Sequence, residues 1–479
     1  MSVELKADVT EDLVVVLPGI MGSTLYKGDR LVWGGTPETA LTALVTRLNG
    51  IMPRDGPSPD YCDEVWAGDL ITGIRLIPGL WTIQYSYGAL LTRLESILGR
   101  KTAVHRTHDP SPHRVDPQVT GLIAFPYDWR LSNRVNGRRL VSVLQDALPR
   151  WRHECSRPNA RVTFICHSMG GLVARWFVQQ EGGAEMTSRI VTIATPHRGA
   201  MKALDQLVNG ARIGVGPFKP AFTTFARSLP SSYELLPEYA CIQGTDARDA
   251  AQLRTIAEYL DDHGHLPEID TQAVRDGLTL LATLKQYPAD APPILPLVGI
   301  RQPTLTTAAV TSSAVTVSEE IGGVDEAGDT TVPRLAATPF QMKPGNPIIH
   351  WAADKHSALQ HNDSVLDQLE GILAEYPERR GEGLAELSVR VDEFANAGAP
   401  VPIQADVAGE PALLEAQVLD EQGTFVLDFP FQALDGHQHG EIPVLPPGVY
   451  QVVVQGRRSA AGRVAPVTSL VAVLDPALD

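Results

Sequence analysis

The segment at residues 164–171 (FICHSMGG) constrains the fold more than any other part of the sequence. A run of strand formers, VTFIC, leads into Ser168, and a helical pattern, GGLVARWFVQQ, follows at once. A serine on such a sharp strand-to-helix turn exposes its hydroxyl, and the residues two before and two after it must be small. Position 166 is Cys instead of the usual Gly, which is still small. A serine that only caps a helix is the alternative, but the strand, the helix and the adjacent His167 favour a nucleophile.

Short apolar runs rich in Val and Ile recur along the chain, with helical patterns between them. Strands that are buried on both faces have such continuous apolar sequences, and their alternation with helices is typical of a parallel sheet in an α/β fold. The runs lie at residues 13–17, 122–125, 162–166, 190–194, 294–300 and 348–351. We therefore expect residues 1–380 to form an α/β-hydrolase domain with a mostly parallel sheet.

Two long stretches, near residues 26–90 and 200–290, interrupt this alternation of strands and helices. Long excursions between sheet elements often form caps or lids over a site. The sequence thus predicts cap insertions at both places, and irregular decoration of the domain is the alternative.

The last part of the chain has a different pattern. Helical periodicity stops, and alternating runs such as LSVRV and GVYQVVV appear between turn signals. Short strands at this spacing predict an all-β, immunoglobulin-like sandwich over residues 384–479, after a linker at residues 377–383 (PERRGEG). This β domain could bind an unknown partner, bind a carbohydrate or pack as a structural appendage.

The composition disfavours several classes of function. A net charge of −16 argues against nucleic acid as a partner and gives an average surface that anionic membranes repel, although a local patch would allow transient contact with a lipid surface. No secretory signal and no run of ~18 apolar residues is evident, so we expect a cytoplasmic protein, with signal-independent secretion as the alternative. No metal or other cofactor is predicted, and free thiols are expected at Cys62, Cys155, Cys166 and Cys241.

The glycine-containing loop at residues 17–25 (LPGIMGSTL) directly follows the first predicted strand. In a hydrolase of this architecture, such a loop supplies one backbone N–H to the developing oxyanion, and the residue after the nucleophile supplies the other. We therefore predict oxyanion donors at Met21 and Met169, with Ile20 as a close alternative to Met21. A plain glycine turn is the other interpretation.

The catalytic acid is expected after the late strand at residues 294–300, since the chain order in this architecture is serine, acid, histidine. Acidic residues cluster there, at residues 324–333 (VDEAGDTTVP). Asp329 is the predicted acid and Asp325 its competitor, although an aspartate in a loop often serves only to form a turn.

The catalytic base is expected after the last strand. A serine hydroxyl needs an imidazole to take its proton, and the imidazole needs a carboxylate to orient it. His356 lies in the predicted loop between that strand and a helix that begins near residue 362, whereas His350 lies within the strand and His361 at the helix entry. The position favours His356.

An ordered set of motifs resembles the lecithin:cholesterol acyltransferase family over roughly residues 12–375. The set comprises LPGIMGS, a helical segment YSYGALLTRLESIL at 85–98, FPYDWR at 125–130, HSMGG at 167–171, ATPHRGA at 194–200, LPSSYELLP at 229–237, GDTTVP at 328–333 and a histidine before a terminal helix. The chain departs from the family pattern in having Cys166, in lacking an evident disulfide-tied lid loop and in carrying the extra β domain. The last two departures leave the substrate open.

The resemblance implies a Ser–Asp–His triad that needs no metal and that cleaves fatty-acyl esters of phospholipids or similar lipids, with water or an alcohol as acceptor. Ser168, Asp329 and His356 match the triad positions, and Met21 and Met169 match the oxyanion donors. The alternatives are an esterase for small non-lipid esters and a catalytically silent hydrolase fold that serves as an interaction protein.

Three further polar residues near these motifs are assigned structural roles. Asp128 and Arg130, in the YDWR motif, are expected to form a buried ion-paired turn. His197 precedes the acid in chain order, so it is not the predicted base.

Overall fold

The protein is described from a computed structural model. It covers residues 9–34, 48–54, 56–72, 87–105, 120–210, 219–243, 252–311, 314–343, 345–374, 384–409, 412–434, 437–457, 460 and 462–474. The predicted linker at residues 377–383 lies outside the described residues.

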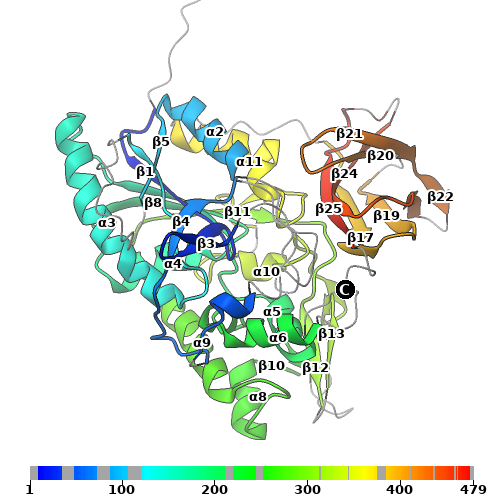
Figure 1. Ribbon diagram of the computed structural model, residues 1–479, viewed down its shortest axis with the longest axis horizontal. Helices are drawn as coiled ribbons and strands as arrows, with labels where there is room; N and C mark the ends of the chain where they lie inside the picture. Colours follow the sequence, from blue (N-terminus) through cyan, green and yellow to red (C-terminus); the bar gives the residue numbers. More distant parts are fainter. Residues whose placement is uncertain are drawn as a thin grey trace, which may run out of the picture.

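A seven-stranded parallel sheet forms the centre of the larger part of the molecule (Figure 1). The strands, in spatial order, are β16 (His350–Ala352), β11 (Ile294–Gly299), β8 (Thr187–Ile193), β7 (Val162–His167), β1 (Leu13–Leu17), β6 (Leu122–Ala124) and β5 (Thr102–Val104). Each of the six predicted apolar runs overlaps one of these strands, which confirms the parallel α/β prediction. The edge strand β5 was not predicted, because its sequence, TAV, is not part of a continuous run of large apolar residues.

Helices cover both faces of this sheet, which explains why its strands are apolar throughout (Figure 1). Alternate residues of β1 face opposite ways: Leu13 and Val15 belong to one apolar core, Val14 and Val16 to the other. One face carries α3 (Asn133–Glu154) and α4 (Gly170–Gln180), and the other carries α2 (Gly88–Leu98) and α11 (Asp363–Leu373). Side chains of alternating orientation along a strand thus build two cores from one sequence run.

Both predicted insertions contain their own secondary structure. The first includes a three-stranded antiparallel sheet, and the second is largely helical. Their described elements are β2 (Ser23–Lys27), β3 (Arg30–Trp33), β4 (Val65–Leu70), α5 (Met201–Asn209), α6 (Lys219–Ser228), α7 (Pro230–Tyr233), β9 (Ile242–Gln243), β10 (Leu253–Arg254), α8 (Ile256–His263) and α9 (Thr271–Lys285). Residues 35–47 and 73–86 of the first insertion lie outside the described residues, and a role for either insertion as a cap stays a prediction.

The connection between β11 and β16 carries shorter elements, of which β12 and β13 extend the small sheet begun by β9 and β10. These elements are β12 (Thr307–Val310), β13 (Val315–Ser318), β14 (Glu320–Ile321), β15 (Val324–Asp325) and α10 (Arg334–Ala337), and the 3₁₀ helix η2 (Leu359–His361) follows β16.

The C-terminal part is all-β, as predicted, and packs a four-stranded sheet against a five-stranded one (Figure 1). The first sheet has the order β17 (Leu387–Val391), β19 (Val401–Val407), β23 (His437–Ile442), β22 (Gln432–Leu434). The second has the order β18 (Phe394–Asn396), β25 (Val467–Leu474), β24 (Gly448–Gly456), β20 (Leu414–Leu419), β21 (Phe425–Pro430). Strand β20 alternates strictly between buried and half-buried residues, the pattern of a sandwich strand with one face in the core. The immunoglobulin-like type and the exact domain limits stay predictions.

Candidate active site

The turn between β7 and α4 has the geometry that its sequence predicts. Ser168 has a φ of 51°, a left-handed conformation that is uncommon for any residue with a side chain. The Ser168 N–H donates to the Ile193 carbonyl in the neighbouring strand (2.8 Å). A Cβ at Gly170 would lie 2.5 Å from the Pro18 carbonyl oxygen, so the position two after the serine must be glycine. The backbone strain at Ser168 is held by contacts on both sides of the turn.

Cys166, two before the serine, is fully buried in the core on one face of the sheet. Its backbone pairs with Leu17 of β1 and Thr192 of β8. The side chain at this position lies in the apolar core, which is why a small apolar residue other than glycine is compatible with the turn.

Ser168, His356 and Asp329 lie together although they are far apart in sequence. The His356 Nε2 is 2.9 Å from the Ser168 Oγ, and the His356 Nδ1 is 2.8 Å from the Asp329 Oδ2. All three side chains are nearly or fully buried, with Asp329 wholly excluded from solvent. A hydroxyl, an imidazole and a carboxylate in this order can abstract a hydroxyl proton and stabilise the resulting imidazolium.

The Asp329 carboxylate is oriented by its own loop. Its Oδ1 accepts hydrogen bonds from the backbone N–H groups of Thr331 (3.0 Å) and Val332 (2.7 Å), which leaves Oδ2 toward the imidazole. The His356 N–H also donates to the Asp329 carbonyl (2.6 Å). The acid loop and the base loop are therefore joined by the main chain as well as by the side chains.

The competing candidates lie in other surroundings. Asp325 is exposed in β15 and accepts from the Ala327 N–H. His350 contacts Ser364 (3.0 Å), and His361 ends the 3₁₀ helix η2. His197 is fully buried and contacts Arg175 and Thr192. The geometry thus brings the three favoured residues together and leaves these four outside the serine–imidazole–carboxylate chain.

The glycine-containing loop after β1 lies directly against Ser168. A Cβ at Gly19 would be 2.9 Å from the Ser168 Cβ, so only glycine allows this approach. Met21 in the loop has a φ of 61°, and Met169 begins the turn into α4. The position of the loop is compatible with oxyanion donors at Met21 and Met169, and the choice between Ile20 and Met21 stays open.

Tyr87 and His167 connect the loops around the serine, and sequence reasoning did not identify this role. The Tyr87 hydroxyl accepts from the Gly19 N–H (2.7 Å) and lies 2.8 Å from the His167 Nδ1, while the His167 Nε2 lies 3.1 Å from the His356 carbonyl oxygen. Burial lowers the pKa of His167 to about 3, so its ring is neutral. A carbonyl only accepts, so the His167 Nε2 carries the proton and the Tyr87 hydroxyl donates to Nδ1.

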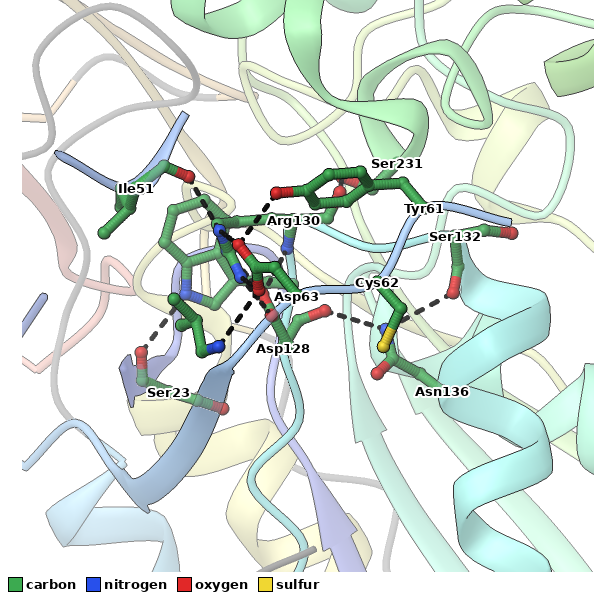
Figure 2. Close-up of polar contacts among 12 residues, drawn as sticks. Ser23, Ile51, Tyr61, Cys62, Asp63, Asp128, Arg130, Ser132, Asn136 and Ser231 are labelled. Carbon is green, nitrogen blue, oxygen red and sulfur yellow. Dashed lines mark hydrogen bonds and ion pairs between the residues drawn. The ribbon is translucent and has the colours of Figure 1, made fainter. Parts of the chain in front are cut away.

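Asp128 and Arg130 form a fully buried ion pair, with 2.6 Å between the Arg130 Nη2 and the Asp128 Oδ2 (Figure 2). The same guanidinium donates to both carboxylate oxygens of Asp63 (2.7 and 3.0 Å) and to the Ile51 carbonyl (2.7 Å). Asp63 belongs to the insertion near residues 26–90, and no sequence motif pointed to it. Arg130 thus anchors that insertion to the sheet domain, and the contacts satisfy a buried charge.

The described residues contain no group of three or more His, Cys, Asp or Glu side chains arranged to bind a metal ion. Within the same parts of the chain, no helix combines the length and hydropathy needed to cross a bilayer. The four cysteines are free, with Cys62 exposed and Cys166 and Cys241 buried.

The strand order, the strained serine turn and the helices on both faces of the sheet define a fold of the α/β-hydrolase class. Residues 118–272 match the model of the lecithin:cholesterol acyltransferase family. The predicted resemblance is therefore confirmed over that range, which includes Ser168 but neither Asp329 nor His356. No curated protein sequence matches the chain.

Solved structures with some similarity include three bacterial proteins. A Bacillus licheniformis lipase, BlEst2 in its propeptide form, is 10% identical, with 97% of this chain and 95% of that chain covered and a TM-score of 0.27. The lin2722 product of Listeria innocua is 9% identical (77% and 96% covered, TM-score 0.27). The phospholipase PlaB of Legionella pneumophila is 11% identical (97% and 92% covered, TM-score 0.20). With TM-scores this low, the fold is not inferred from these structures. It follows from the strand order and from the turn at Ser168.

Proposed function

We propose that this protein is a serine-dependent acyl-ester hydrolase or O-acyltransferase that acts on lipid esters of the phospholipid type. The observation that carries the proposal is the continuous chain of contacts from the Ser168 Oγ through the His356 imidazole to the Asp329 carboxylate, at 2.9 and 2.8 Å. The family match over residues 118–272 supports a lipid ester as the substrate class.

In the first half of the reaction, the His356 Nε2 takes the proton of the Ser168 hydroxyl as Oγ attacks the ester carbonyl carbon. The tetrahedral oxyanion accepts hydrogen bonds from the backbone N–H groups of Met21 and Met169. The intermediate then expels the alcohol, which receives the proton from His356, and an acyl group remains on Ser168. Asp329 stays ionised and stabilises the imidazolium during both proton transfers.

In the second half, His356 takes a proton from water or from an acceptor alcohol, whose oxygen attacks the acyl-enzyme. Collapse of the second tetrahedral intermediate releases a free acid or a new ester and restores the Ser168 hydroxyl. Hydrolysis and acyl transfer share this acyl-enzyme and differ only in the acceptor.

A fluorophosphonate probe tests the nucleophile directly, because it reacts with an activated serine. We expect labelling at Ser168, located by mass spectrometry, and its loss in Ser168→Ala. Ser142→Ala is a matched control, since Ser142 is an exposed helix residue. Absence of labelling in the wild type would contradict the proposal and favour a hydrolase fold that serves as an interaction protein.

A panel of esters tests the substrate class. We expect turnover of long-chain esters and of phospholipid presented in mixed micelles, and added alcohols should divert product from free acid to a new ester if the protein is a transferase. Activity confined to short-chain soluble esters would contradict the lipid assignment while leaving the serine mechanism intact.

A further inference from the structure

We propose that the C-terminal β sandwich positions the catalytic acid and base, and that Gln302 is the residue through which it holds the acid loop. This inference rests on the proposed function of Ser168, Asp329 and His356. It concerns the two segments that carry the acid and the base, each of which lies against the sandwich.

Gln302 joins the acid loop to the sandwich through both its backbone and its side chain. Its N–H donates to the Gly328 carbonyl and its carbonyl accepts from the Gly328 N–H, both at 2.9 Å. Gly328 directly precedes Asp329. The Gln302 side chain donates from Nε2 to the Leu387 carbonyl (2.8 Å) and accepts at Oε1 from the Val389 N–H (3.0 Å). Gln302 is fully buried, so these contacts are shielded from water.

The partner of the Gln302 amide is the free edge of a sheet. Among the residues that the structure describes, β17 is the outer strand of its sheet and pairs with β19 on one side. The unpaired N–H and C=O groups of an edge strand normally face solvent or another chain. Here the Leu387 carbonyl is an acceptor and the Val389 N–H is a donor. The side-chain amide of Gln302 forms a hydrogen bond with each, in the way that the backbone of a neighbouring strand would. Glutamine is the longer of the two side chains that carry a primary amide, which offers a donor and an acceptor in one planar group.

The base loop is held in a corresponding way. Asp354, two residues before His356, is buried, and its carboxylate accepts from the Lys355 N–H (2.8 Å) and the Asn362 Nδ2 (3.0 Å). The backbone of Thr468, which belongs to β25 of the sandwich, lies close enough to this carboxylate to favour its charged form. Lys355 is buried as well, and the negative charge of Glu393 of the sandwich favours its protonated form.

Apolar packing and rim ion pairs complete this interface. Leu470, Ala472 and Leu474 of β25 belong to the same apolar core as the sheet domain. At the rim, Arg390 of β17 forms a bidentate ion pair with Glu319 (2.8 and 2.9 Å), in which the Arg390 side chain is 57% exposed and the Glu319 side chain 34% exposed. The interface therefore has a buried part that touches the two loops of the candidate acid and base, and a more exposed rim that includes the Arg390–Glu319 pair.

This difference allows a direct test with full-length protein. Gln302→Met keeps the length of the side chain but removes both hydrogen bonds, which leaves the Leu387 carbonyl and the Val389 N–H buried without partners. We expect kcat for a soluble ester to fall about 10- to 100-fold, because a displacement of the acid loop by a fraction of an ångström misaligns the imidazole. KM and the circular dichroism spectrum should stay close to wild type, and phosphonate labelling should slow by the same factor as kcat.

Glu319→Gln is the matched control, because it weakens a domain contact at the exposed rim; we expect unchanged kcat. Hydrogen exchange gives a readout that is independent of turnover: the Thr331 and Val332 amides, which donate to Asp329, should exchange faster in Gln302→Met and not in Glu319→Gln.

The proposal is overturned if folded Gln302→Met retains wild-type kcat and wild-type exchange at these amides. If that variant does not fold, Asp354→Asn replaces it, because it weakens the contact of the base loop with Thr468, and wild-type kcat in that variant would overturn the proposal equally. A wild-type protein with neither ester turnover nor labelling would instead refute the proposed function, and the exchange measurement would still show whether the sandwich orders the acid loop.

Discussion

The candidate nucleophile and its two partners are held in place by different means. Ser168 is positioned by elements adjacent to it in sequence, a buried strand and the helix that follows, with a left-handed backbone at the turn. Asp329 and His356 lie in loops after strands near one edge of the sheet, and these loops contact the C-terminal sandwich through Gln302 and Asp354. The candidate nucleophile is thus held mainly by its own strained turn, whereas the loops of the candidate acid and base contact a second domain.

This comparison predicts that substitutions at the serine turn and substitutions behind the acid or base will have different main effects. A change at the serine turn acts through steric contacts with backbone atoms, so its main effect should be on stability. A change behind the acid or base acts through the orientation of a hydrogen-bonding group, so its main effect should be on rate. Substitutions on each side can separate these two cases.

The largest effect is expected from removing the serine or the imidazole. Ser168→Ala and His356→Ala should each lower kcat by about 10⁴–10⁶, and the double variant should lose no more than either single variant, because the groups act as one unit. Steady-state ester hydrolysis by the four proteins measures this. Multiplicative losses in the double variant would show that the two residues act separately and would contradict a shared proton path.

Asp329→Asn should lower kcat by about 10⁴ without loss of fold. The Thr331 and Val332 N–H groups donate to Oδ1, so the amide oxygen of an asparagine must take that place and its NH₂ must face the imidazole. The His356 Nδ1 would then accept a hydrogen bond, and Nε2 would carry the proton that it should instead remove from Ser168.

Ester turnover by Asp329→Asn and by its control, Asp325→Asn, checks this prediction. Asp325 is the exposed competitor in the same loop region, so its substitution should leave kcat unchanged. The reverse result, with activity lost only in Asp325→Asn, would show that Asp325 and not Asp329 is the acid.

The sequence predicted those features that are encoded over short distances. Ser168 was identified from the strand before it and the helix after it, and Asp329 and His356 from their order after late strands. The alternation of apolar and polar residues was also enough to predict an all-β domain over residues 384–479. These signals are local because periodicity and turn chemistry are properties of neighbouring residues.

The contacts that support the site could not be predicted in this way. Tyr87 reaches Gly19 across 68 positions, and Gln302 reaches Leu387 across 85. Asp63 reaches Arg130 across 67. A single tyrosine, glutamine or aspartate of this kind has no distinctive neighbours in sequence, and its partner is decided only by how the layers pack. The strands and the candidate nucleophile were therefore accessible from sequence, whereas the residues that orient the loops were not.

A smaller effect, on stability, is expected at the serine turn. Gly170→Ala would place a Cβ 2.5 Å from the Pro18 carbonyl oxygen and 2.9 Å from the Leu17 Cβ, and a backbone oxygen cannot move aside as the end of a side chain can. We expect the free energy of unfolding in urea to fall by about 2–3 kcal/mol.

Gly371→Ala is the control for this substitution. Gly371 lies in α11, where a Cβ would meet open space, so alanine should stabilise the helix by up to about 1 kcal/mol. Equal stabilities of Gly170→Ala and wild type would show that the turn is not as tight as these distances imply, and would weaken the contrast between the two sides of the site.

The smallest expected effect is on the pH dependence of stability. It comes from Glu234, which is not one of the three residues Ser168, His356 and Asp329. Glu234 is buried and accepts hydrogen bonds at the start of α3 from the Ser132 hydroxyl, the Asn133 N–H (2.7 Å) and the Asn133 Nδ2 (2.8 Å). Burial outweighs these bonds and raises the pKa of Glu234 to about 7, from an ordinary value of 4.5. Between these two values the native state holds a proton that the unfolded chain has released, so the free energy of unfolding falls as the pH rises.

Glu234→Gln cannot ionise, so its stability should decline less than that of the wild type between pH 5 and pH 7, by about 1–2 kcal/mol. Urea unfolding at the two pH values measures this difference. Some decline should remain, because burial also raises the pKa of Asp354, to about 6, and that group acts in the same direction. An identical decline in variant and wild type would show that Glu234 is ionised in the native state, and that the start of α3 accommodates its charge better than its burial suggests.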